Sequence, residues 1–157
     1  MSYAPQRESY IFGSLPSKDL RFAIKDSRME QSKQKIREFT DLIAWQEGHK
    51  LVLLVYQSTN SFPRTELYSL TDQIRRCVVS ITSNIAEGFG RQTYKEKIQY
   101  YYQSQGSLTE LKNQIIIAKD VGYLTDKGAR VILEQATIAH RLLQGLITAS
   151  KRFLHHS

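Results

Sequence analysis

A stripe of apolar residues in the middle of the chain constrains its fold more than any other sequence feature. Its members recur at steps of three and four residues: Leu67, Leu70, Ile74, Cys77, Val78, Ile81 and Ile85. At about 100° per residue, this spacing places all of them on one side of an α-helix, in a band roughly 100° wide. A helix with such a band must bury it against other elements. The stripe therefore predicts a helix that faces a shared hydrophobic core.

Residues that start and stop helices divide much of the chain into four helical segments. The predicted segments are 40–60, 64–87, 93–121 and 125–153. Pro63 stops the first, and Gly88 and Gly90 are predicted to close the second as left-handed caps. Thr93 and Glu96 form a capping box that opens the third. The predicted N-caps of the first and fourth segments are Thr40 or Asp41 and Thr125.

Helix number and connection length together predict the architecture. Four helices of about 20 to 29 residues joined by short turns must alternate in direction. The predicted fold is therefore all-α, an up-and-down four-helix bundle over residues 39–157. Residues 1–38 show no sustained period and contain Pro5, Gly13 and Pro16. We expect them to form an N-terminal arm that is irregular or ordered by a partner.

Composition excludes several classes of protein. The chain has 157 residues, of which 41% are hydrophobic and 24% charged, as in soluble globular domains. Its apolar runs are far shorter than the roughly 18 residues of a membrane-spanning helix, and its first residues are polar, unlike a secretory signal. Cys77 is the single cysteine and cannot form an internal disulfide. We therefore expect a cytoplasmic protein with no membrane partner.

The charge of the chain favours acidic partners. It has 22 Lys and Arg against 15 Asp and Glu, a net charge of +7. Residues 1–39 have eight basic and five acidic side chains, a net of +3, and residues 40–157 have fourteen and ten, a net of +4. The excess is thus spread along the chain and forms no dense basic arm. RNA and DNA are the obvious acidic partners for such a protein.

A polar stripe runs beside the apolar stripe on the second predicted helix. Its members are Gln73, Arg76, Ser80, Asn84 and Glu87. They lie within about 80° of one another around the helix axis. Two interpretations are open. The stripe is either a polar edge of the core, where hydrogen bonds fix the register of the helices, or a seam for binding or subunit contact.

The third predicted helix has more apolar surface than one inward face requires. Tyr100 and Tyr102 point about 100° to either side of Tyr101, and Ile116 and Ile117 fan away from the inward side. Surplus apolar surface is usually covered by another molecule. We therefore predict a homo-oligomer interface at Tyr100, Tyr102, Ile116 and Ile117. The alternative is that the tyrosines are simply half-exposed.

The sequence lacks the common motifs of catalysis and of metal or cofactor binding. It has no HExxH, CxxC or helical Glu-x-x-His pair, and neither a GxxxxGK[ST] nor a GxGxxG phosphate loop. Ser80, Ser83 and Cys77 have no histidine nearby in the sequence to activate them. We therefore expect no enzymatic activity, no catalytic residue, no cofactor and no metal.

Several motifs occur in an order that resembles a known family. They are Asp41-Leu-Ile-Ala-Trp-Gln46, Phe62-Pro63, Glu66-Leu-Tyr-Ser-Leu70, Gln73-Ile-Arg-Arg-Cys77, Ser80-Ile-Thr-Ser-Asn-Ile-Ala-Glu-Gly88, Gly90-Arg91 and Gly106-Ser-Leu-Thr-Glu110. Together they resemble the four-helix-bundle family of 23S ribosomal RNA intervening-sequence proteins, over about residues 38–153. The arm at residues 1–37 departs from the short family pattern.

The resemblance implies more than the spacing does. Proteins of this family form up-and-down bundles that assemble into pentameric rings, and no catalytic activity is established for them. Their superfamily includes the accessory variability determinants of diversity-generating retroelements. Those proteins form basic pentameric barrels that bind RNA and a reverse transcriptase. The resemblance therefore implies a homopentamer and a role with nucleic acid.

Three functional hypotheses follow. The first is a non-enzymatic homo-oligomer that contacts the backbone of RNA or DNA through basic surface residues. The second is an accessory subunit of a retroelement reverse transcriptase, in which protein–protein contact dominates; a reverse transcriptase gene beside this one would distinguish it. The third is a structural oligomer without a nucleic-acid role. Only the first two predict binding to polyanions that weakens as salt rises.

The predicted phosphate contacts lie on the second and third helices. They are Arg75, Arg76, Arg91, Lys95 and Lys97, with Lys112 and Lys119 as a second set. We expect each to act through charge and not through base reading, because no recognition motif is present. The alternative is a solvated face, since Lys119 neighbours Asp120 and Arg130 has Glu134 one turn on.

Overall fold

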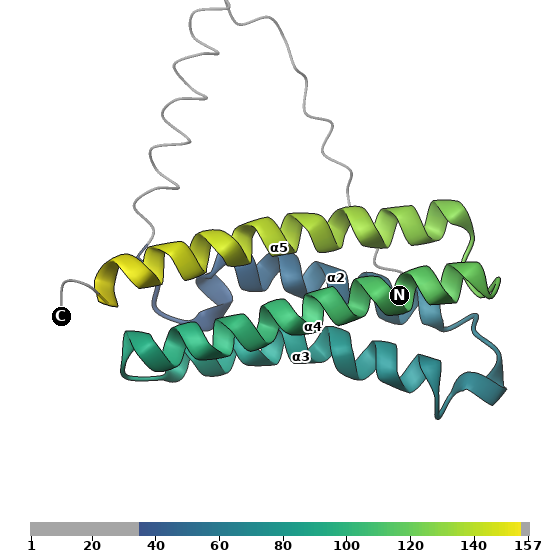
Figure 1. The fold of residues 1–157 in the computed structure, drawn as a ribbon, viewed down its shortest axis with the longest axis horizontal. Coiled ribbons are helices and arrows are strands. Elements are labelled where there is room, and N and C mark those ends of the chain that lie inside the picture. The colour runs from purple at the N-terminus through teal and green to yellow at the C-terminus, as the bar shows by residue number, and fades with distance from the viewer. Residues whose placement is uncertain (1–34, 155–157) are drawn as a thin grey trace, which may run out of the picture. The chain divides into compact units, whose positions relative to one another are not determined.

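Four long helices form an up-and-down bundle in the computed structural model, which describes residues 35–154. The long helices are α2 (Ile43–Thr59), α3 (Leu70–Gly90), α4 (Tyr94–Asp120) and α5 (Asp126–Leu154), and two 3-10 helices are η1 (Phe39–Asp41) and η2 (Arg64–Glu66). Successive long helices run in opposite directions and lie side by side (Figure 1). The predicted all-α fold is confirmed. The arm predicted at residues 1–38 falls almost entirely outside the described residues.

The apolar stripe of α3 forms the centre of the core. Ile74, Val78, Ile81 and Ile85 are buried almost completely, as the periodicity predicts. Each such side chain stabilises the fold by about 1.5–3 kcal/mol relative to its exposed state. The other helices bring Leu51, Val55, Leu108, Leu111, Ile115, Ile132, Leu143 and Ile147 to the same core. Leu67 is the exception in the stripe, because it lies before α3 and is exposed.

The second helix starts later than predicted. A helix from residue 64 is wrong, because η2 ends at Glu66 and α3 begins at Leu70. The Glu66 carboxylate interrupts the helix by accepting hydrogen bonds from the Ser69 hydroxyl and from the Leu70 N–H, the latter at 3.3 Å. Tyr123, on the connection between α4 and α5, donates to the other carboxylate oxygen at 3.1 Å. These hydrogen bonds hold the pKa of Glu66 below its usual value.

The prediction of left-handed caps at Gly88 and Gly90 is also wrong. Both glycines lie inside α3, and Gly122 is the residue with positive φ (84°) among residues 35–154. Gly122 ends α4, where the Tyr123 N–H donates to the Ala118 carbonyl at 2.8 Å and closes the last turn. Gly88 has a different role: it packs against the ring of Tyr101 in α4.

Of the three predicted N-caps, two are confirmed and one is wrong. Thr93 and Glu96 form the capping box of α4, and the Thr125 hydroxyl accepts from the Gly128 N–H at 3.1 Å in the first turn of α5. Thr40 and Asp41 do not cap the first long helix, whose N-cap is Leu42. Asp41 instead accepts from backbone N–H groups that precede η1, at 2.8 and 3.1 Å.

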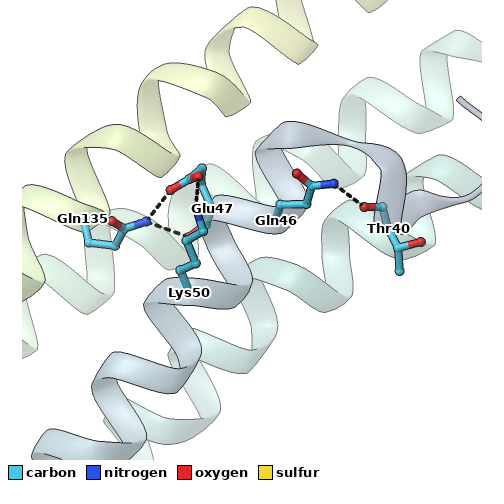
Figure 2. A network of polar contacts seen from close by, with 5 residues as sticks. All are labelled: Thr40, Gln46, Glu47, Lys50 and Gln135. Carbon is cyan, nitrogen blue, oxygen red and sulfur yellow. Dashed lines mark hydrogen bonds and ion pairs between the residues drawn. The ribbon is translucent and has the colours of Figure 1, made fainter. Parts of the chain in front are cut away.

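A polar network joins the first and last helices of the bundle (Figure 2). The Gln135 side-chain amide on α5 donates to the Glu47 carbonyl at 3.0 Å and to the Glu47 carboxylate at 2.8 Å. Lys50 pairs with the same carboxylate at 2.6 Å. Nearby, Gln46 donates to the Thr40 carbonyl at 2.9 Å and fixes the approach of η1 to α2. The network therefore sets the register of α2 against α5.

Candidate nucleic-acid interface

The two predicted arginines in the first half of α3 differ in their surroundings. Arg75 joins α3 to the end of α2: its guanidinium donates to the Thr59 hydroxyl at 2.9 Å and to the Asn60 side chain at 3.0 Å, and lies 5.0 Å from the Tyr56 ring centroid. Arg76 is exposed and pairs with Asp72, one turn earlier, at 3.2 Å. Arg75 thus has a structural role, and the charge of Arg76 is partly neutralised by the Asp72 carboxylate.

Two basic residues at the turn between α3 and α4 are held by the turn itself. Arg91 pairs with Glu87, donates to the Tyr100 hydroxyl at 2.5 Å, and lies 4.5 Å from the Tyr100 ring centroid. The Lys97 ammonium donates to the Phe89 carbonyl at 2.5 Å. Burial lowers the pKa of Lys97. Both cations therefore stabilise the turn, and they also bring positive charge to this end of the bundle.

The three remaining predicted lysines lie along α4. Lys95 is exposed and has no ion pair within residues 35–154. Lys112 is half-buried, and Lys119 pairs with Asp120 at 3.1 Å, a contact that raises the pKa of Lys119. At 1.5 Å per residue, Lys119 lies about 36 Å along the helix from Lys95. The seven predicted residues therefore do not form one patch.

The structure adds basic residues that the sequence reasoning missed. The C-terminal turn of α5 lies beside the start of α4 (Figure 1), where Phe153 stacks on Tyr94 with ring centroids 5.0 Å apart. Lys151 and Arg152 of that turn therefore lie at the same end as Arg91 and the start of α4. The signal was available: in an up-and-down bundle, the last helix ends beside the start of the third.

These two segments define what we call the basic end of the bundle: residues 87–97 and 151–154. They hold five basic residues (Arg91, Lys95, Lys97, Lys151 and Arg152) and two acidic ones (Glu87 and Glu96). Their net charge is five minus two, +3, out of the +4 carried by residues 40–157. The positive charge of the bundle is therefore concentrated, although its distribution in the sequence looks even.

The polar stripe of α3 makes contacts that fix helix register. The Ser80 and Ser107 hydroxyls lie 3.0 Å apart across α3 and α4, and the Asn84 amide donates to the Ser80 carbonyl at 2.9 Å. Cys77, in the adjoining apolar stripe, lies 3.0 Å from the Ser107 carbonyl. Of the other stripe members, Glu87 pairs with Arg91 and Gln73 is exposed.

Three of the four predicted interface residues are exposed on α4. The exposed fractions are 45% for Tyr102, 44% for Ile116 and 42% for Ile117, whereas Tyr100 is half-buried beneath Arg91. An open groove of about 660 Å³ lies between α4 and α5, one turn from Ile116. Its lining includes Lys119, Ala129, Leu133, Thr137 and Ile138. Apolar surface is therefore available to another molecule here.

No group of three or more His, Cys, Asp or Glu in residues 35–154 could hold a metal ion. Burial raises the pKa of the Cys77 thiol to about 12, which keeps it protonated and unreactive. His140 contacts the Gln105 side chain at 2.9 Å. Within the same residues, no helix has the length and hydropathy needed to cross a membrane.

Comparison with known proteins identifies the family. The family model for the 23S rRNA-intervening sequence protein matches residues 40–145. The chain belongs to this family. A member of the S23 ribosomal protein family from Bacteroides thetaiotaomicron, described as a protein of unknown function, has a similar solved structure. The TM-score is 0.62 at 18% identity, covering 68% of this chain and 96% of the other. No curated protein matches the sequence.

Proposed function

We propose that this member of the family is a non-enzymatic homo-oligomer that binds the phosphate backbone of RNA or DNA without reading its sequence. The observation that carries the proposal is the basic end, where residues 87–97 and 151–154 have a net charge of +3. Phosphate binding through Lys and Arg needs only such a concentration of charge. The name of the family refers to 23S rRNA, which supports RNA as the nucleic acid.

Assembly strengthens the proposal because it multiplies the charge. Ile116 and Ile117 are exposed on α4, within one turn of Lys119, which lines the groove between α4 and α5; contact between copies would cover them. An oligomer would then present one basic end per subunit. A polyanion that contacts several of these ends releases more counterions than one bound to a single subunit. Modest charge on each subunit is then enough for useful affinity.

Salt dependence tests the proposed binding. We expect the full chain to bind a structured RNA at about 50 mM salt and to bind it at least tenfold more weakly at about 200 mM, because phosphate contacts release counterions. Filter binding at the two concentrations measures this. Light scattering on the same sample gives the assembly, and we expect a multiple of 18.2 kDa. Absence of binding at the lower salt concentration would leave a structural oligomer as the better description.

A further inference from the structure

We infer that Tyr102, Lys95 and Lys151 form a stacking site for an unpaired nucleobase, so that the bundle prefers single-stranded nucleic acid. The inference rests on the proposed function and adds the class of ligand. Tyr102 lies on α4 with 45% of its surface exposed, and the Lys151 ammonium from α5 lies 5.3 Å from its ring centroid. Lys95 lies two turns before Tyr102 on the same side of α4.

Lys95 and Tyr102 line a groove of suitable size and chemistry, and Lys151 contacts the Tyr102 ring. The groove has a volume of about 540 Å³, within the range of roughly 300–1,000 Å³ that is usual for small-ligand sites. Its lining residues are Lys95, Ile98, Gln99, Tyr102 and Gln103. The lining thus combines a cation, two amides, an aromatic ring and an aliphatic side chain, and it contains no carboxylate that would repel phosphate.

The groove matches the parts of one nucleotide. A tyrosine ring stacks on the flat face of any base, an ammonium binds phosphate, and glutamine amides donate to and accept from base edges. In the free protein the Lys151 ammonium makes a cation–π contact with the Tyr102 ring. A stacked base replaces that contact and leaves the ammonium to pair with the adjoining phosphate. A duplex conceals the base faces, so the site selects an unpaired strand.

The site is separate from the proposed subunit contact. Tyr102 and Ile116 are fourteen positions apart on α4, about 21 Å along the helix axis. Tyr102 lies next to the basic end, in contact with Lys151, whereas Ile116 lies one turn before Lys119, which lines the groove near Ile138. The surplus apolar surface of α4 therefore divides into an aromatic site for bases and an aliphatic site for a second copy.

Binding of a fluorescein-labelled ten-nucleotide oligouridine RNA, compared with a labelled RNA duplex of the same length, tests the inference. We expect Tyr102→Leu to weaken single-strand binding about 5- to 150-fold, the loss typical of one stacked base. Duplex binding should stay within about twofold, since it uses phosphate contacts alone. Tyr102→Phe keeps the ring and should keep the affinity. Tyr68→Leu, at a 90% exposed tyrosine outside the basic end, is the matched control.

The contributions of Lys95 and Lys151 are tested by the salt dependence of single-strand binding. We expect Lys95→Ala and Lys151→Ala each to reduce the salt slope for the single strand by about 0.7, because each removes one phosphate contact. Lys127→Ala, in the first turn of α5 at the opposite end of that helix, should leave the slope unchanged.

Each remaining outcome has a definite meaning. Equal binding of both RNAs, unaffected by Tyr102→Leu, overturns the stacking site but leaves backbone binding intact. No binding of either RNA at about 50 mM salt overturns both proposals. A Tyr102→Leu protein that becomes smaller in light scattering shows that Tyr102 is a subunit contact, which also overturns the inference. Circular dichroism confirms that each variant keeps its helices.

Discussion

At the scale of single residues, Gly88 shows how closely α3 and α4 approach. A Cβ atom at this position would lie 2.6 Å from Cε1 of Tyr101 and 3.1 Å from Cβ of Tyr100. Gly90, two residues later in the same helix, has no atom within 4 Å of the equivalent point apart from its chain neighbours and the backbone of its own helix. The two glycines look alike in the sequence, because the ring that distinguishes them comes from the next helix. Their separate roles could therefore not be predicted.

This difference predicts opposite effects of the same substitution. We expect Gly88→Ala to reduce the free energy of unfolding by about 1–3 kcal/mol, because an added methyl group in a close contact forces neighbouring side chains to move. Gly90→Ala should increase it by about 0.4–1 kcal/mol, because alanine restricts the unfolded chain and meets open space. Urea unfolding measures both. Equal stability of the two variants would show that α3 and α4 separate easily at Gly88.

At the scale of helices, accuracy of prediction depended on whether the signals were local. The capping box of Thr93 and Glu96 and the hydroxyl cap of Thr125 each lie within four residues, and both were predicted correctly. The predicted start of α3 was wrong because Glu66 accepts hydrogen bonds from Ser69 and Leu70, which the sequence reasoning overlooked, and also from Tyr123, which is 57 residues away. A contact at that separation has no signature in one sequence. The register of α2 against α5 was missed for the same reason.

That register depends on Glu47, and the dependence predicts an effect of pH. Hydrogen bonds from Lys50 and Gln135 hold the pKa of Glu47 below its ordinary 4.5 in the folded protein. A lowered folded pKa stabilises the protein above the unfolded value, and this contribution is lost as the pH falls through the folded value. We expect Glu47→Gln to cost a few tenths to about 1 kcal/mol at pH 7. The loss of unfolding free energy caused by Glu47→Gln should become smaller below pH 4.5.

Urea unfolding at several pH values measures this trend. Glu134→Gln, which replaces an exposed carboxylate on α5 with no ion pair in residues 35–154, is the matched control. The free energy of unfolding of Glu134→Gln should differ from that of the unsubstituted protein by about the same amount at every pH. If Glu47→Gln lowers the free energy of unfolding by the same amount from pH 7 to pH 3, the network stabilises the fold through packing and not through the charge of Glu47.

At the scale of the whole molecule, the candidate site arises from topology. The sequence predicts the total charge and most of its carriers, but Lys151 joins Lys95 and Tyr102 only when the direction of each helix in the bundle is considered. That grouping exists because α4 begins where α5 ends. Conversely, Arg75 looks available for phosphate in the sequence, yet in the fold it holds the end of α2. Topology therefore decides which cations a partner can reach.

The last prediction concerns how assembly and nucleic-acid binding depend on each other. We expect Ile116→Asp to dissociate the oligomer to 18.2 kDa subunits, because a carboxylate buried between copies would lack a partner. Helix content should persist, since Ile116 is 44% exposed within its own bundle. The salt slope of RNA binding should fall at the same time, as one basic end makes fewer phosphate contacts than several.

Leu53→Asp, at an exposed leucine on α2, is the matched control and should leave both the mass and the slope unchanged. Light scattering, circular dichroism and filter binding on the same preparations measure the three quantities. If Ile116→Asp dissociates the oligomer but leaves the salt slope of RNA binding unchanged, binding does not depend on assembly, because each bundle then binds RNA independently. Loss of helix content in Ile116→Asp would place Ile116 within the folded core of the subunit, and its exposure on α4 argues against that result.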